Sequence, residues 1–213
     1  MLSLTRRLAK IRGEHGFTMM EIIVVLAVVG VMAAVLSPMI LNYVDDARKA
    51  KAERDVKVLA GLIVQLTRDT QHFPMYFDGT KTTGTPDIEL LFGPGNDPVD
   101  NSTSGQAWLG TTKKDDLANH LIINKPGGAS NTNKYSTTGR FSWKGPYLDQ
   151  LTVDPWGNRY LVNIKNGNPG DAAPGKVIWV LSGGPNGKIE TDPTAPSDSG
   201  PVPGGDDVAV RVR

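Results

Sequence analysis

The feature that most constrains this chain is an apolar stretch close to its N-terminus. Residues 17–41 carry one charged side chain, Glu21, and residues 22–36 contain no polar side chain. A helix of about 20 apolar residues crosses a bilayer, whereas the apolar part of a secretory signal peptide has only about 7 to 15 residues. The sequence therefore predicts a membrane-spanning helix over residues 17–41.

The segment before this helix is basic, with four Lys or Arg residues and one acid among residues 6–14. Such a cluster beside a membrane helix stays on the cytoplasmic side. Within the helix Glu21 is the exception, because an ionised carboxylate costs about 2.5 to 3.5 kcal/mol in the bilayer core. Glu21 is thus either tolerated at the level of the lipid headgroups or matched with a positive charge.

Residues 16–21 read GFTMME, and together with the apolar helix and Pro38 they resemble the processing site of type IV pilins and type II secretion pseudopilins. The resemblance implies that a prepilin peptidase cuts after Gly16, removes the leader 1–16 and N-methylates Phe17. It also implies that Glu21 pairs with the Phe17 amine of a neighbouring subunit and sets the register of assembly. Such pairing offsets the desolvation of both charges.

The helix is expected to continue beyond the membrane as an amphipathic segment over residues 42–73. Apolar residues recur there at steps of three and four, which is typical of a helix that buries one face; they are Ala52, Val56, Leu59, Ile63 and Leu66. Pro38 is expected to kink the helix or melt it locally, because proline removes one backbone hydrogen bond. Phe73-Pro74 is expected to end it.

Residues 74–142 are rich in Gly, Thr, Asn, Asp and Pro, and this composition predicts loops. One short helix is expected over residues 114–122, capped by Thr112, with Leu117 and Leu121 facing inward. His120 within it is interpreted as a structural or surface histidine. The glycine-rich pieces lack the lysine of a phosphate-binding loop, and the balanced net charge of +1 gives no indication of nucleic-acid binding.

Residues 143–213 contain the phrase Asp154-Pro155-Trp156-Gly157-Asn158, which resembles the core signature of major pseudopilins. Trp156 is interpreted as a packing anchor. Three stretches alternate or run apolar, 160–164, 177–181 and 208–212, and they predict the strands of a small antiparallel sheet. The expected architecture is α+β and pilin-like: a long N-terminal helix, its first half transmembrane, packed on a small C-terminal antiparallel sheet with long loops.

The chain has no cysteine, so any covalent or metal cross-link that stabilises it must be something other than a disulfide. Resemblance to the major pseudopilins implies a calcium site between the last two strands. Position by position, the ligands would be the Gly183 carbonyl, Asn186, Asp206 and Asp207, and hard oxygen donors of this kind suit Ca²⁺. This sequence departs from the family pattern in the neutral Asn186 and in a longer loop. A flexible acidic loop is the alternative.

The function that the resemblance implies is structural and not enzymatic. The chain would polymerise with copies of itself into a periplasmic pseudopilus of a type II protein secretion system. It would be anchored once in the bacterial inner membrane, with its C-terminal domain in the periplasm. Its partners would be minor pseudopilins, the prepilin peptidase and the inner-membrane assembly platform.

Two alternatives stay open from the sequence. One is a major or minor pilin of a surface type IV pilus, although the chain lacks the paired C-terminal cysteines common in such pilins. The other, more remote, is a membrane-anchored periplasmic enzyme or binding domain. No nucleophile with a base and no set of metal-binding histidines is recognisable in the sequence, so a catalytic role has no candidate residues.

Overall fold

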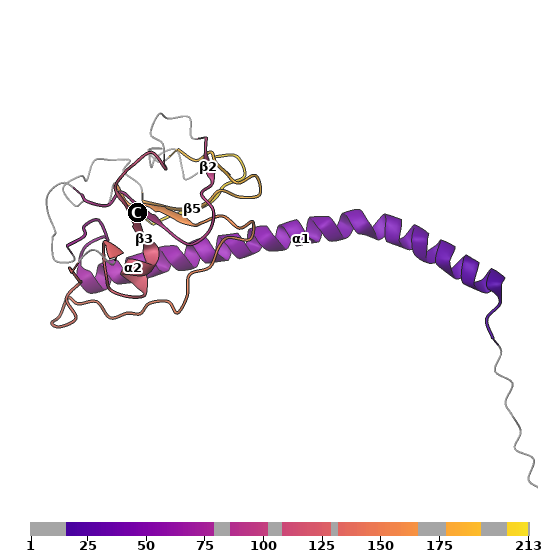
Figure 1. Cartoon of the computed structure of the whole chain (residues 1–213), viewed down its shortest axis with the longest axis horizontal. Helices are drawn as coiled ribbons and strands as arrows, with labels where there is room; N and C mark the ends of the chain where they lie inside the picture. Colours follow the sequence, from indigo (N-terminus) through magenta and orange to yellow (C-terminus); the bar gives the residue numbers. More distant parts are fainter. Residues whose placement is uncertain are drawn as a thin grey trace, which may run out of the picture. The chain divides into compact units, whose positions relative to one another are not determined.

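The structure is a computed structural model that describes residues 16–78, 86–101, 108–128, 132–165, 178–192 and 204–212. The leader before Gly16 lies outside these ranges. The chain divides into two compact units, Met1–Asp45 and Asp46–Arg213, which are described separately. Figure 1 follows the elements along the chain.

A single helix, α1 (Met19–Thr70), contributes to both units. It begins after Thr18, whose Oγ1 accepts a hydrogen bond from Glu21 N at 3.1 Å, as an N-cap residue does. It continues through Pro38 without interruption, so local melting is not seen, and the expected kink stays a prediction. It ends three residues before the expected Phe73-Pro74, because Gln71 takes a positive φ of 66°.

In the first unit the apolar side chains of α1 are exposed. An 18-residue window of this helix has a mean hydropathy of 2.7, and none of the window is buried within the chain. By length and composition α1 is long and apolar enough to cross a membrane. Its apolar surface therefore has to be covered by lipid or by other protein chains.

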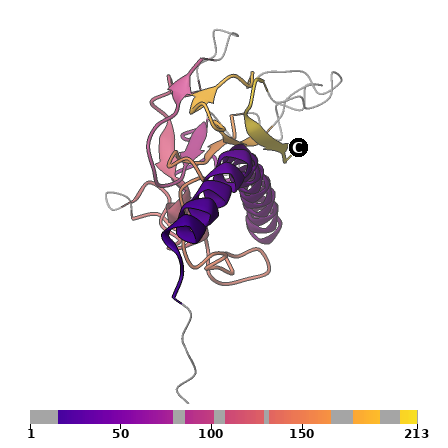
Figure 2. The same ribbon diagram turned by 90° about the vertical axis from the view of Figure 1, so that its right-hand side faces the viewer.

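The second unit holds a five-stranded sheet in the order β3-β1-β4-β5-β7, next to the second half of α1 (Figures 1 and 2). Its strands are β1 (Leu90–Phe92), β3 (Lys114–Asp116), β4 (Leu161–Asn163), β5 (Trp179–Ser182) and β7 (Val208–Arg211). All neighbours pair antiparallel except β1 and β3, which are parallel. A separate parallel pair joins β2 (Val99–Asp100) to β6 (Lys188–Ile189).

The three C-terminal strands and their antiparallel pairing confirm the prediction, with boundaries shifted by one or two residues. Residues 74–142, predicted as a loop-rich segment with one short helix, also supply the short strands β1, β2 and β3, which were not predicted. The expected helix over 114–122 was also too long. Lys114–Asp116 forms β3, and only Leu117–Leu121 is helical, as α2.

The helix α2 is capped by Asp116, not by Thr112. The Asp116 carboxylate accepts from Ala118 N at 2.8 Å, and the Asp116 backbone is extended. Pairing of β3 with β1 explains the difference, since it holds residues 114–116 in an extended conformation that their helical pattern alone does not predict. Leu117 and Leu121 are buried, which confirms their inward orientation.

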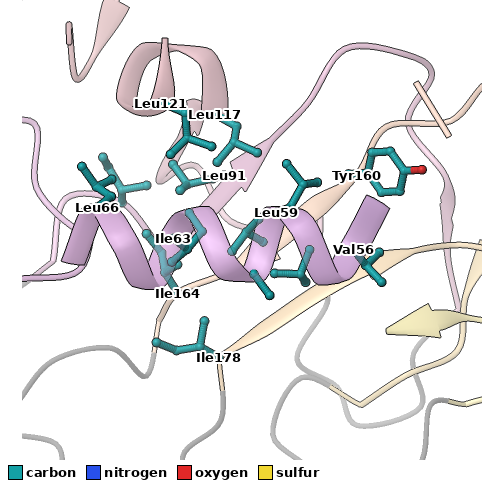
Figure 3. Packing of buried hydrophobic residues seen from close by; sticks show 14 of the residues in the cluster. Val56, Leu59, Ile63, Leu66, Leu91, Leu117, Leu121, Tyr160, Ile164 and Ile178 are labelled. Atoms are coloured by element: carbon teal, nitrogen blue, oxygen red, sulfur yellow. The ribbon is translucent and has the colours of Figure 1, made fainter. Parts of the chain in front are cut away.

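The predicted stripe of α1 packs on one face of the sheet. Val56, Ile63 and Leu66 are fully buried, and Figure 3 shows them with side chains from the strands and from α2. Each buried side chain of this size contributes about 1.5 to 3 kcal/mol. Trp156 packs against the same cluster, as predicted for an anchor.

The opposite face of the sheet is covered as well. A second apolar cluster gathers there, made of Leu90, Trp108, Leu161, Trp179, Leu181 and Ile189. Leu90 and Leu91 are neighbours in β1 but belong to different clusters, as the alternation of side chains along a strand requires. The sheet is thus buried on both faces, and Trp108, Leu109 and Ile189 lie over the face away from α1.

Candidate functional site

The first candidate site is the start of α1. Glu21 is the third helical residue, in the turn that directly follows Phe17, and both side chains are exposed. A carboxylate in the first turn interacts favourably with the positive end of the helix dipole. Among the residues that the structure describes, Glu21 makes no ion pair.

Gly16 has no structural role among the described residues. A Cβ atom built on Gly16 would meet no described atom within 4 Å, so local packing does not require glycine there. Packing among the described residues thus gives no reason for a glycine at position 16, and its role as a cleavage site stays a prediction. Gly16 and Phe17 precede α1, and Glu21 lies in its first turn.

The second candidate site is formed by the turn that follows β5 and the residues that precede β7. Asp206 Oδ2 accepts from Asn186 N at 3.1 Å, which ties the two segments together. Gly184 has a φ of +63°, and a Cβ there would lie 2.3 Å from the Asp206 carbonyl oxygen. Glycine is required at this position because the two backbones touch.

Asp207 is almost buried at the base of this loop. Its Oδ2 accepts from Glu190 N at 2.8 Å, and from Thr191 N and Thr191 Oγ1 at 2.6 Å each. Burial raises the pKa of the Asp207 carboxyl, the bonds from Thr191 and Glu190 N lower it in part, and the Glu190 carboxylate raises it further. The hydrogen-bond donors around Asp207 therefore do not fully offset the burial of its negative charge.

Two carboxylate oxygens in the loop are left without a donor. Asp206 Oδ1 and Asp207 Oδ1 are buried, and no hydrogen-bond donor of the described chain reaches either of them. A buried acceptor without a partner is costly. A cation can satisfy buried carboxylate oxygens of this kind, so the two unpartnered oxygens are the observation that fits the calcium expectation.

The other predicted ligands fit less directly. Asn186 Oδ1 accepts from Lys188 N at 2.6 Å, and Asn186 Nδ2 is directed at Glu190 Oε2. Gly183 lies close to the Lys188 carbonyl, since a Cβ on Gly183 would be 3.1 Å from that oxygen. Among the residues that the structure describes, no three His, Asp or Glu side chains form a metal-binding group. A cation here would depend on backbone carbonyls.

Sequence reasoning missed Glu190. Its carboxylate lies against Gly205, where a Cβ would collide with Glu190 Oε2. The acid directly follows β6 and is separated from Asp206 by the 15 residues 191–205 of the sequence, so no local pattern indicates that it turns toward Asp206 and Asp207. Glu190 is the third acid around this loop, and it increases the local negative charge.

A buried histidine cluster joins the middle of the chain. His120 is fully buried, its Nε2 lies 2.9 Å from Asp115 Oδ2, and its Nδ1 lies 2.6 Å from Tyr135 Oη. Burial raises the pKa of Asp115, but the hydrogen bond and charge of His120, with bonds from Gly127 N and Asn119, outweigh this and lower it. The structural interpretation of His120 is the one that these contacts support.

The N-terminal segment matches the family model of the prokaryotic N-terminal methylation motif over residues 11–37. This motif stands at the head of a long helix that packs on a small sheet, an arrangement consistent with a pilin-like α+β fold.

Over most of its length the chain is similar to type II secretion system core protein G. It is 25% identical to that protein of Escherichia coli (strain K12) over 179 residues, which cover 84% of this chain and 87% of the relative. It is 23% identical to that of Pseudomonas aeruginosa over 181 residues, 85% and 92% of the two chains. For that of Aeromonas hydrophila the identity is 23% over 183 residues, 85% and 90%. Comparison with solved structures found no significant match.

Proposed function

We propose that this chain is the major pseudopilin of a type II secretion system, a structural subunit that polymerises into a periplasmic pseudopilus. The observation that carries the proposal is the head of α1. An acid without a counter-charge in the described protomer stands in the first turn of an exposed apolar helix, directly after the Gly16-Phe17 junction. The named relatives favour the pseudopilin over a surface pilin and over a membrane-anchored enzyme.

Assembly follows from the chemistry of this segment. Cleavage after Gly16 creates a positively charged amine on Phe17, and N-methylation keeps its charge. In a filament the Glu21 carboxylate of one subunit pairs with the Phe17 amine of the next, because neither charge is stable alone in an apolar environment. The remaining apolar surface of the first half of α1 is covered by lipid before assembly and by neighbouring helices afterwards.

The proposed location is the inner membrane, crossed once by the first half of α1. The basic leader holds the N-terminus in the cytoplasm, so the unit Asp46–Arg213 lies in the periplasm. There it meets minor pseudopilins and neighbouring copies. The prepilin peptidase and the assembly platform act on it at the membrane.

We propose that calcium binds between the turn that follows β5 and the residues that precede β7. Asp206 Oδ1 and Asp207 Oδ1 would hold it, with backbone carbonyls that include Gly183, and Asn186 could join after rotation of its side chain. A bound Ca²⁺ supplies positive charge and links residues 183–190 to residues 204–207. Such a cross-link replaces the stabilisation that a disulfide gives other exported proteins.

The function is tested by deleting the gene and measuring release of secreted proteins and surface piliation in the same strain. Loss of secretion with normal piliation is expected, and the reverse outcome would assign the chain to a surface pilus. Mass spectrometry of the membrane-extracted protein adds a direct test of processing. The expected mature chain begins at N-methylated Phe17, and a retained leader would contradict the proposal.

A further inference from the structure

Asp154 lies at the start of the Asp-Pro-Trp-Gly turn and is only 2% exposed. Its Oδ1 accepts from Trp156 N at 3.0 Å and from Asn158 N at 2.7 Å, so this oxygen shapes its own turn. Its Oδ2 points elsewhere and accepts from Ser182 Oγ at 2.7 Å. One buried carboxylate thus connects the turn to the end of β5.

Ser182 is fully buried and is the last residue of β5. Its only hydroxyl proton goes to Asp154, so a lone pair of the oxygen is available to accept from Gly184 N at 3.3 Å. The direction of this hydroxyl is therefore fixed by the carboxylate. Ser182 thus holds the backbone of Gly183 and Gly184, the first two residues of the cation loop (residues 183–187).

The same turn supports the other end of the loop. Gly187 packs on the Asn158 side chain, and a Cβ on Gly187 would lie 3.3 Å from Asn158 Nδ2. Gly187 N in turn donates to the Gly184 carbonyl at 3.2 Å. Residues 183–187 are thus held at both ends by residues 154–158, while their other side contacts Asp206.

We propose that Asp154 and Ser182 are positioning residues of the cation loop. They hold the backbone of residues 183–187 against Asp206 before a cation arrives, so that calcium affinity depends on two side chains that are not expected to touch the ion. This proposal rests on the calcium site of the proposed function. Preorganisation lowers the ordering that binding requires, and loss of such supporting bonds costs about 10- to 100-fold in metal affinity.

The test compares S182A with wild type and with S142A, using the full mature chain in detergent. Ser142 is a matched control, because it is also buried and its Oγ also makes a hydrogen bond, to Gly139 O at 3.2 Å, but it is remote in sequence from the loop. Calcium dissociation constants are measured by titration calorimetry. Thermal midpoints are measured in calcium and in chelator.

For S182A we expect calcium affinity to fall about tenfold or more and the thermal shift caused by calcium to shrink, with S142A unchanged in both. An S182A affinity equal to that of wild type, or a midpoint lowered equally in calcium and in chelator, would overturn the proposal. If S182A does not fold, D154N is measured in the same two assays. The asparagine side chain has the size of the aspartate, but the Nδ2 group that replaces Oδ2 is a donor and cannot accept the Ser182 hydroxyl proton. If the wild-type chain binds no calcium, both this proposal and the proposed calcium site are wrong. The proposed function as a structural subunit does not depend on that result.

Discussion

Replacing Asp207 with asparagine separates two roles of this carboxylate. Its Oδ2 accepts three hydrogen bonds, from Glu190 N, Thr191 N and Thr191 Oγ1, and an amide oxygen of the same size can accept all three. The negative charge itself is unfavourable without a cation, because burial and the Glu190 carboxylate raise the pKa of Asp207. D207N therefore removes charge while it keeps the hydrogen bonds.

The expected result is a crossover. In chelator at neutral pH, D207N is at least as stable as wild type, because a folded-state pKa above the ordinary value of 3.8 means that stability is lost as pH rises through it. In calcium the wild type gains about 2.7 kcal/mol at a concentration 100-fold above its dissociation constant. D207N loses most of this gain, which for a chain of this size corresponds to about 5 to 10 °C in thermal midpoint.

The assay is thermal unfolding of the full mature chain in detergent, in calcium and in chelator, with D149N as control. Asp149 is exposed and distant in sequence from the loop, so its variant should show the wild-type calcium shift. The reasoning is refuted if D207N keeps a wild-type calcium shift. It is also refuted if D207N is several degrees less stable than wild type in chelator, since its hydrogen bonds would then depend on the charge.

Three further predictions address assembly, packing and pH. E21Q should abolish pseudopilus assembly measured by shearing and immunoblot, because an amide cannot neutralise the Phe17 amine, and normal assembly of E21Q would contradict the role of Glu21 in subunit register. The control E53Q, on the exposed face of α1, should assemble normally. I63A should lower the free energy of unfolding by about 2 to 5 kcal/mol in urea titrations, whereas V58A, which is 47% exposed, should change it little; equal effects would argue against the buried stripe. The lowered pKa of Asp115 predicts that its contribution to stability is fully present above about pH 3.8 and is lost as pH falls through the folded-state pKa. D115N should lose this dependence of stability on acid pH, and an unchanged dependence would contradict a stabilising role of the Asp115-His120 pair.

Much of the fold could be predicted from local pattern. Residues 17–41 indicate a membrane helix through length and polarity alone, and the spacing of Val56, Ile63 and Leu66 indicates its buried face further on. The three C-terminal strands are visible because alternation is a local signal. Glu21 and its position after Gly16 are equally local, which is why the candidate assembly segment needed no structure to be found.

The surroundings of the candidate calcium ligands were predicted only in part, and calcium binding itself stays a prediction. Asp206 lies against residues 184 and 186 as expected, and Asp207 contacts Glu190 and Thr191. Asn186 directs its oxygen to Lys188 N, and Glu190 was not predicted. Side-chain direction at a turn depends on which backbone donors lie nearby. Those donors belong to segments that are distant in sequence, so a sequence pattern does not predict them.

Helical periodicity and the order of residues 16–21 are properties of neighbouring positions. They already indicate a helix with an apolar first half, a buried stripe further on and a candidate processing site at its start. The parallel pairing of β1 with β3, the enclosed Asp115-His120-Tyr135 cluster and the bond from Ser182 to Asp154 were decided only on folding. Each of these joins groups whose free energy depends on shared burial, and burial exists only after distant segments have packed. A residue such as Ser182 therefore has no distinguishing feature in the sequence, although in the folded chain it links the cation loop to the turn beneath it.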